Sequence, residues 1–217
     1  MKLLKLLLVS IFIINSQVIF AQIKQEKPSK KLDEYLKKLQ KSDAVTEALV
    51  ESVVNGDDKV KVYSIKTLAL QKNKNALPIF LDYLGYGLTI RTVNKGKYEQ
   101  TSAWEVRLES AIALGRVKDP KAIPFLEKML KMDNSYIVKK GIIWALGELK
   151  SEQSVPLLTK ILKLAKDQSV VMACVKALGK IGNKKSFMPL LSVTQGNYIE
   201  SIKKEAVKSL EMIKWEK

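Results

Sequence analysis

The stretch that decides the fold runs from Val106 to Leu126 and reads VRLESAIALGRVKDPKAIPFL. Residues 106–117 carry apolar side chains three or four positions apart, which is the spacing of one face of an α-helix. Residues 118–120 are typical of a turn, and a second helical stripe of apolar residues follows them. Pro124 falls in the first turn of that second helix, where a missing N–H costs little. The stretch therefore predicts a pair of antiparallel helices.

The same pattern recurs along the chain at a fixed interval of 32 residues. The tripeptide Ala-Leu-Gly and its variant Ser-Leu-Glu stand at 113–115, 145–147, 177–179 and 209–211. An upstream copy is centred on Leu68, which lies 46 residues before Leu114. One helix pair cannot cover its own apolar stripe, so neighbouring pairs must stack. We therefore expect an all-α fold, an α-solenoid of stacked antiparallel helix hairpins.

The glycine that ends each Ala-Leu-Gly has two interpretations. Gly115, Gly147 and Gly179 either end the first helix of their copy or let a neighbouring helix come close. The alanine two positions earlier also permits a close approach between helices. The sequence leaves both interpretations of the glycines open.

These residues resemble HEAT repeats, specifically the short type named after phycobilisome lyases. That pattern is roughly V-R-x-x-A-x-x-A-L-G, a turn with D-P, then A-x-P-x-L. It is matched here by Val106-Arg107, by 113–115, by Asp119-Pro120 and by 122–126. Other copies replace the arginine with Lys139, Val171 and Lys203. The resemblance spans about 60–215 and implies a HEAT-like solenoid. The resemblance also implies two other possible functions. One is DNA binding, as in basic HEAT-like proteins, and the other, by analogy of fold alone, is lyase activity.

Residues 1–21 predict a secretory signal peptide. Lys2 and Lys5 precede an apolar run over 6–14, and Ala21 offers a small residue at a cleavage site. The apolar segment is shorter and more polar than a membrane-spanning helix of about 20 residues, although an uncleaved anchor remains an alternative. We expect cleavage, export to the bacterial periplasm or cell envelope, and no stable membrane span afterwards. Losing Lys2 and Lys5 lowers the net charge from +16 to +14.

The remaining chain divides into a linker and a series of helical units. We expect a polar linker at 22–29, an N-terminal capping hairpin at 30–56, repeats at 57–84, 103–133, 134–167 and 168–197, and a capping helix at 198–217. The extra residues at 85–102 predict a β-hairpin, because an alternating β-branched run leads into the turn Asn94-Lys95-Gly96. Arg91 and Tyr98 in this insertion are candidate partner contacts. A tolerated loop that only pads the scaffold is the alternative.

The composition excludes several kinds of chemistry. Of 217 residues, 38 are Lys or Arg and 22 are Asp or Glu, yet only three of the 38 are Arg. The chain has no His and one Cys, so it has no histidine triad, no histidine metal site and no internal disulfide. Cys174 stands in an apolar helix and is interpreted as a buried small hydrophobe. We expect no catalysis, no cofactor and no metal.

Four lysines recur at equivalent positions of the second helices: Lys128, Lys131, Lys160 and Lys163. We expect them to line adjacent rows on the concave face, where an acidic protein segment or a polyanion could dock. An ordinary solvated helix surface is the alternative. The pattern stops at both ends, since Asp82 and Ser192 take the equivalent positions.

Ile112 and Trp144 occupy a position of the first helices where other copies carry lysine. We expect them to be neighbours on the outer, convex row. An exposed Trp beside an Ile would form a contact patch. The alternative is that the insertion folds over both side chains and buries them.

The function that fits these features is an exported protein-interaction scaffold or assembly factor. Its partner would be a protein with an acidic segment, held by the concave helices and the insertion. A polyanion or nucleic-acid binder is the alternative, although export argues against nucleic acid. A lyase-like enzyme rests on the resemblance alone. The sequence does not determine the oligomeric state.

Overall fold

The computed structural model describes residues 44–85, 93–94, 97–98 and 103–215. The expected signal peptide, the polar linker, residues 30–43 and Arg91 lie outside the described residues. The described part is helical apart from one pair of very short strands. None of the helices described is both long and apolar enough to cross a lipid bilayer.

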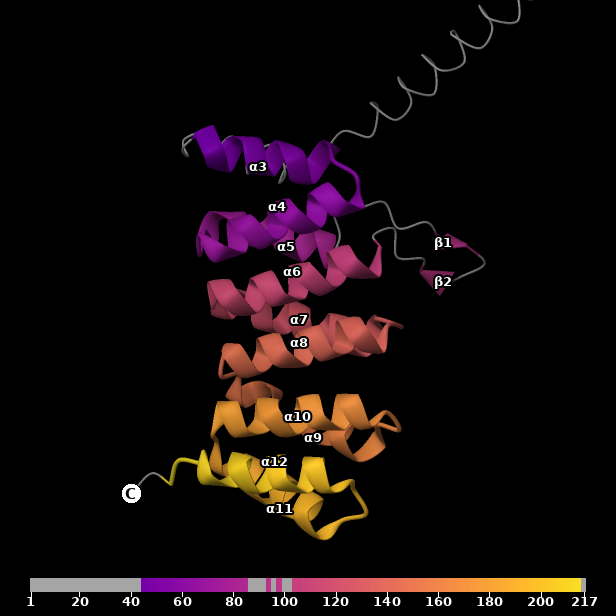
Figure 1. Ribbon diagram of the computed structural model, residues 1–217, viewed down its shortest axis with the longest axis vertical. Coiled ribbons are helices and arrows are strands. Elements are labelled where there is room, and N and C mark those ends of the chain that lie inside the picture. Colours follow the sequence, from indigo (N-terminus) through magenta and orange to yellow (C-terminus); the bar gives the residue numbers. More distant parts are fainter. Residues whose placement is uncertain (1–43, 86–92, 95–96, 99–102, 216–217) are drawn as a thin grey trace, which may run out of the picture. The chain divides into compact units, whose positions relative to one another are not determined.

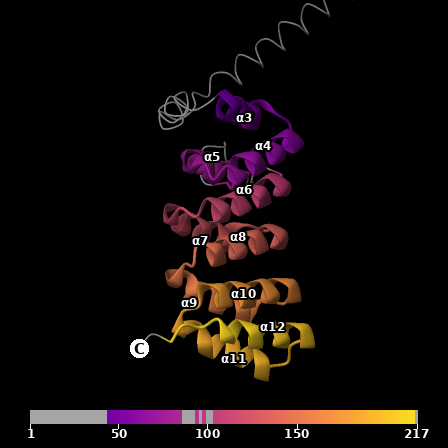
Figure 2. The same cartoon turned by 60° about the vertical axis from the view of Figure 1, so that its left-hand side comes forward.

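The helices alternate between two rows (Figure 1). After α3 (Ala44–Asn55), the first helices of the copies are α4 (Asp58–Leu70), α6 (Trp104–Val117), α8 (Tyr136–Glu148), α10 (Gln168–Ile181) and α12 (Glu200–Glu211). The second helices are α5 (Leu77–Tyr83), α7 (Ile123–Met132), α9 (Val155–Leu164) and α11 (Phe187–Gln195), and a 3-10 turn precedes each of them. Figure 2 shows the two rows side by side. The expected α-solenoid is confirmed.

Local sequence signals explain where these helices begin. Pro124 stands in the first turn of α7, as expected from its missing N–H. The Ser135 hydroxyl accepts the N–H of Val138 at 3.4 Å and so caps α8. The Asp167 carboxylate accepts the N–H groups of Ser169 and Val170 and caps α10. The Ser169 hydroxyl also donates to this carboxylate and does most to lower the pKa of Asp167 below its usual value, and the two N–H groups add to that effect.

The first helices form a closely packed row. Each of α4, α6, α8 and α10 packs against the next first helix, whereas the second helices contact one another only sparsely. The main partner of a second helix is the first helix that follows it, as with α7 and α8. Each second helix thus bridges to the next copy, and the repeat bounds expected from the sequence stay a prediction.

Glycine explains the close packing of the first helices. A Cβ added at Gly115 would lie 2.8 Å from the Cα of Ala145, and one at Gly147 would lie 3.0 Å from the Cα of Ala177. Both glycines lie inside their helices. Of the two interpretations of these glycines, close approach is therefore the one that the structure supports.

We call the closely packed row of first helices the inner row and the row of second helices the outer row, as names alone. Both rows carry similar apolar stripes, while among the described residues only the first helices carry glycines at such close contacts. The expectation that the second helices line the concave face stays a prediction.

A buried ion pair joins α6 to the end of α7. The Arg107 guanidinium donates to the Asp133 carboxylate at 2.8 Å, and both side chains are buried. Asp133 also accepts the N–H of Ser135 at 2.8 Å. One carboxylate thus fixes the end of α7 to α6 and to the start of α8.

The insertion is described only in part. Strands β1 (Val93–Asn94) and β2 (Lys97–Tyr98) pair in antiparallel fashion, with Val93 opposite Tyr98. The rest of 86–102 lies outside the described residues. A protruding β-hairpin therefore stays a prediction.

Candidate protein-interaction surfaces

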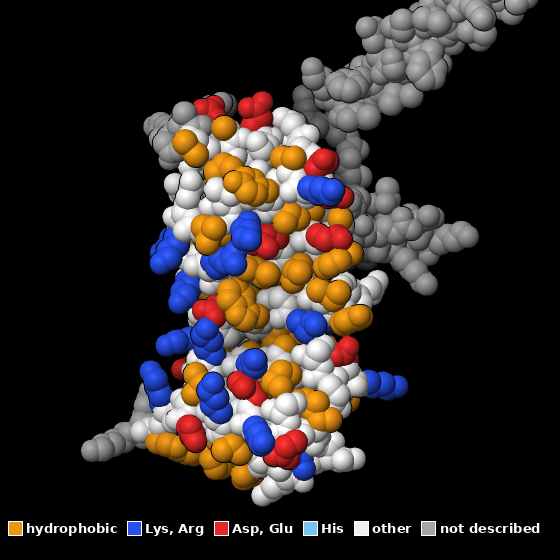
Figure 3. Space-filling model, in the orientation of Figure 1, with side chains coloured by type: hydrophobic (Ala, Val, Ile, Leu, Met, Phe, Trp, Pro, Cys, Tyr) orange, Lys and Arg blue, Asp and Glu red, His pale blue; other side chains and the backbone are white. Residues whose placement is uncertain are grey.

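An apolar patch lies on the inner row, where α6 meets α8. Trp144 exposes 39% of its surface, and Leu108 and Ile112 are partly exposed. Neither Ile112 nor Trp144 is buried. Figure 3 shows hydrophobic side chains gathered across the middle of this face, with lysines mainly toward one side and below. We call Leu108, Ile112 and Trp144 the inner patch.

Small residues shape the inner patch. A Cβ at Gly115 would meet Cζ3 of Trp144 at 2.7 Å, and a Cβ at Gly141 would meet Cδ1 of Leu108 at 2.6 Å. The large side chain of each helix thus lies over a glycine of the other. This arrangement places the Trp144 ring against α6 and leaves part of the side chain exposed to solvent.

Several charges beside the inner patch are paired within the chain. Glu109 accepts from the Arg116 guanidinium at 3.0 Å on α6. Glu148 on α8 pairs with Lys180 on α10 and lies 3.9 Å from the Lys118 ammonium. These pairs span three successive repeats and leave the apolar side chains as the distinctive feature of this face.

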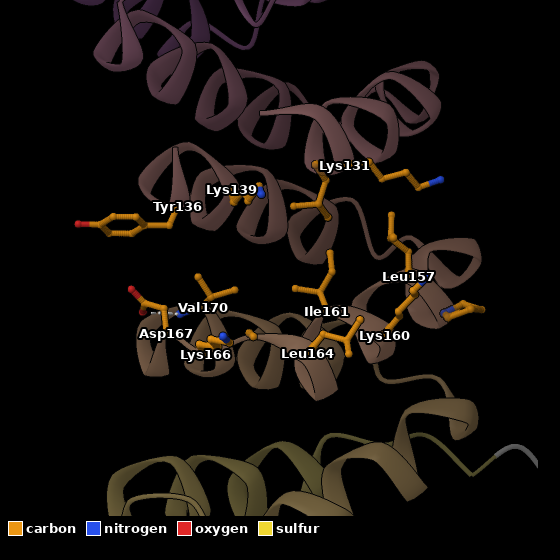
Figure 4. Close-up of a pocket in the computed structure, with 13 residues that line it drawn as sticks. Lys131, Tyr136, Lys139, Leu157, Lys160, Ile161, Leu164, Lys166, Asp167 and Val170 are labelled. Carbon is orange, nitrogen blue, oxygen red and sulfur yellow. Dashed lines mark hydrogen bonds between the residues drawn. The ribbon is translucent and has the colours of Figure 1, made fainter. Parts of the chain in front are cut away.

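A groove of about 810 Å³ opens on the outer row, between α7 and α9. Its apolar lining includes Leu130 from α7, Leu157, Ile161 and Leu164 from α9, and Val170 from α10. Figure 4 shows Ile161 and Val170 projecting from the lower side of the groove toward α7 and α8. The groove exists because α7 and α9 do not pack closely on each other.

Basic side chains surround this groove. Lys131 and Lys139 stand on the α7–α8 side, and Lys160 and Lys166 stand on the α9 side. The lining contains one acid, Asp167, which is occupied in capping α10. The groove therefore combines an apolar floor with a positive rim.

The predicted lysines divide between two positions. Lys131 and Lys160 line the groove, while Lys128 and Lys163 are exposed on the same helices but outside the lining. All four lie on the second helices α7 and α9, as expected, and their place on a concave face stays a prediction. The side chain of Tyr98 lies outside the described part of the chain, as does Arg91.

A family model for HEAT repeats matches residues 96–146 and 133–211, which together cover just over half of the chain. The chain is a HEAT-repeat protein. It is also similar in fold to a solved structure from Nostoc sp. PCC7120, the complex of CpcE and CpcF of phycocyanin lyase. That similarity has a TM-score of 0.61 at 16% sequence identity and covers 87% of this chain and 69% of that one. No curated protein matches the sequence significantly.

Sequence reasoning missed part of the groove of this HEAT-repeat protein. Lys139 was noted only as a replacement for the motif arginine, and Lys166 and Leu164 were not singled out. A signal was present, because Leu157, Ile161 and Leu164 follow helical spacing on a second face of α9. The core face of the same helix carries Val155, Leu158 and Leu162.

The titratable groups of the HEAT repeats offer little chemistry in the described segments. Burial raises the pKa of the Cys174 thiol to about 12, so the thiol stays protonated and is a poor nucleophile. Burial, and then the Asp82 carboxylate, raises the pKa of Tyr83 to about 12. Among the described residues, no three Cys, Asp or Glu side chains gather as metal ligands would.

Proposed function

We propose that this HEAT-repeat protein is an exported scaffold that binds a protein partner and carries no catalytic activity of its own. The observation that supports it most directly is the inner patch. An exposed Trp next to Ile and Leu, on the closely packed row of a solenoid, is typical of a protein contact. HEAT repeats commonly mediate interactions between proteins, which favours the same function.

The patch can be tested by replacing its central side chain. Trp144→Ala removes the exposed ring and should abolish capture of the envelope partner by the immobilised protein. Trp215→Ala is the matched control, because Trp215 is 63% exposed and lies beyond α12, against Phe187. Circular dichroism should show both variants folded. Equal capture by the two variants would refute binding through the inner patch.

Export is a separate part of the proposal and has its own test. We expect the mature chain to begin at Gln22 and to appear in the periplasmic or envelope fraction. Mass spectrometry of the N-terminus together with cell fractionation measures both. A full-length chain in the cytosolic fraction would contradict export.

A polyanion binder is the second candidate, favoured by the net charge of +16 and by the four lysines on α7 and α9. Binding to phosphate chains releases counterions, so affinity would fall steeply with salt. The groove argues for a different ligand, because an apolar floor does not contribute to contacts with a bare polyanion. A salt titration with a short DNA duplex separates the two candidates.

The CpcE–CpcF complex is named as a phycocyanin lyase, but a similarity at 16% identity concerns the fold alone. Lyase activity is therefore not carried over to this chain. The absence of histidine and the protonated state of Cys174 support a binding role rather than group transfer.

A further inference from the structure

The second helix α9 has two apolar faces, and only one of them is used by the fold. Val155, Leu158 and Leu162 are buried in the core. Leu157, Ile161 and Leu164 stand at positions i, i+4 and i+7 and line the outer groove instead. Leu164 exposes 69% of its surface. A helix with a second apolar stripe is suited to binding another amphipathic element.

The rim of the groove selects the charge of that element. The four lysines of the lining stand on both sides of the apolar stripe. Asp167, the one acid, already accepts hydrogen bonds at the start of α10, and Lys140 contributes to lowering its pKa. A ligand with acidic groups on both sides of an apolar face would complement this pattern.

The length of the groove walls selects the size of the ligand. Helices α7 and α9 each have 10 residues, which corresponds to about 15 Å at a rise of about 1.5 Å per residue. A helical segment of about three turns fills that length. Its apolar side chains would follow the i, i+3, i+4, i+7 spacing that such grooves accept.

We propose that the groove between α7 and α9 binds an acidic amphipathic helix of a partner protein, about three turns long. Its apolar face lies on Leu157, Ile161 and Leu164, and its carboxylates face the surrounding lysines. The inference rests on the proposed function as a protein-binding scaffold and adds a second surface, on the opposite row from the inner patch.

Other occupants fit the groove less well. A second copy of this chain carries the same positive net charge, +14 after loss of the expected signal peptide, and would be repelled by the basic rim. A bare polyanion would use the lysines but leave the apolar stripe in water. The next gap along this row differs too, since Ser192 on α11 takes the place that Lys160 has on α9.

The probe is a synthetic peptide of about 14 residues with Leu on one helical face and Glu on both flanks, and its binding is measured by fluorescence anisotropy. Lys131→Glu/Lys160→Glu should weaken binding about tenfold, because attraction becomes repulsion at two rim positions. The matched control is Lys128→Glu/Lys163→Glu, which changes the net charge equally but lies outside the lining. Leu164→Ser should weaken binding as well, and its exposed position makes misfolding a minor concern.

Two results would overturn the groove proposal. One is equal binding of a scrambled peptide of the same composition, which would reveal simple charge attraction. The other is an equal effect of the two double lysine variants. Trp144→Ala should leave peptide binding unchanged. If the native protein does not bind the peptide but still captures its partner in a Trp144-dependent way, the groove proposal alone is refuted. If it binds the peptide but its capture of the partner does not depend on Trp144, the inner-patch proposal alone is refuted.

Discussion

At the scale of single residues, Gly115 sets how closely α6 and α8 approach each other. In Gly115→Ala the new Cβ would meet the Cα of Ala145, which is backbone and can move only with its helix. We expect the free energy of unfolding to fall by about 1–3 kcal/mol, the usual cost of overpacking. Chemical denaturation followed by circular dichroism measures it.

Gly141→Ala is the control on the same interface. Its Cβ would meet the far end of the flexible Leu108 side chain, which can rotate away. Alanine also favours a helix over glycine by about 1 kcal/mol. We expect this variant to be as stable as the native chain or more stable. If both glycine variants lost equal stability, close backbone approach would not explain the packing of the inner row.

Arg107 illustrates how a buried charge depends on its partner. In Arg107→Ala the Asp133 carboxylate stays buried and loses the guanidinium, while it still accepts the Ser135 N–H. We expect a loss of about 3–5 kcal/mol of stability, measured by urea denaturation. The double variant Arg107→Met/Asp133→Asn should recover part of that loss. A single variant as stable as the native chain would show that the pair contributes little.

At the scale of elements, four of the five first helices, α4, α6, α8 and α10, are followed within two residues by a left-handed residue at an equivalent position. Lys72, Lys118 and Lys150 have φ values of 52°, 56° and 49°, and Gly182 takes the equivalent position with φ of 68°. Lysine is strained in this conformation and glycine is not. Lys150→Gly should therefore stabilise the protein by roughly 0.5 kcal/mol after the greater entropy of unfolded glycine is subtracted.

Thermal denaturation measures the effect of Lys150→Gly, and the reverse change provides its control. Gly182→Ala should lower stability, because the new Cβ would stand 2.9 Å from the Met212 carbonyl oxygen in a left-handed conformation. A decrease in stability for Lys150→Gly would show that the lysine side chain stabilises the turn by more than the strain costs.

The elements also show how far the sequence predicts this structure. The interval of 32 residues predicts both rows of helices, and Pro124 and Ser135 predict where α7 and α8 begin. Which row packs more closely was not predictable in the same way, because an apolar stripe has the same spacing on either row. The short distance across Gly115 and Ala145 shows that the first helices form the closely packed row. The groove was missed because Leu157, Ile161 and Leu164 look like core residues until Leu158 and Leu162 are seen to occupy the core.

At the scale of the whole molecule, the described helices form a chain of nearest-neighbour contacts. Helix α12 packs against α10 and α11. Its buried residues are Ile202, Ala206 and Ser209, and Ser209 lies against Gly179. In such an array the stability of the whole is close to a sum over the repeats and the interfaces between them. A change in a terminal repeat therefore affects mainly the stability of the adjacent repeat.

Removing residues 196–217 tests this view, because it uncovers α10 and α11 and leaves the contacts of α6 with α8 intact. We expect amide hydrogen exchange to speed up markedly in α10 and α11 and to change little in α6 and α8, where Gly115 and the Arg107–Asp133 pair still hold the repeats together. Mass spectrometry of peptides from each helix gives the protection repeat by repeat. Equal loss of protection from α4 to α11 would contradict local coupling and would show that the repeats unfold as one cooperative unit. Protection retained at α6 and α8 would mean that the inner patch can be studied in the shortened chain.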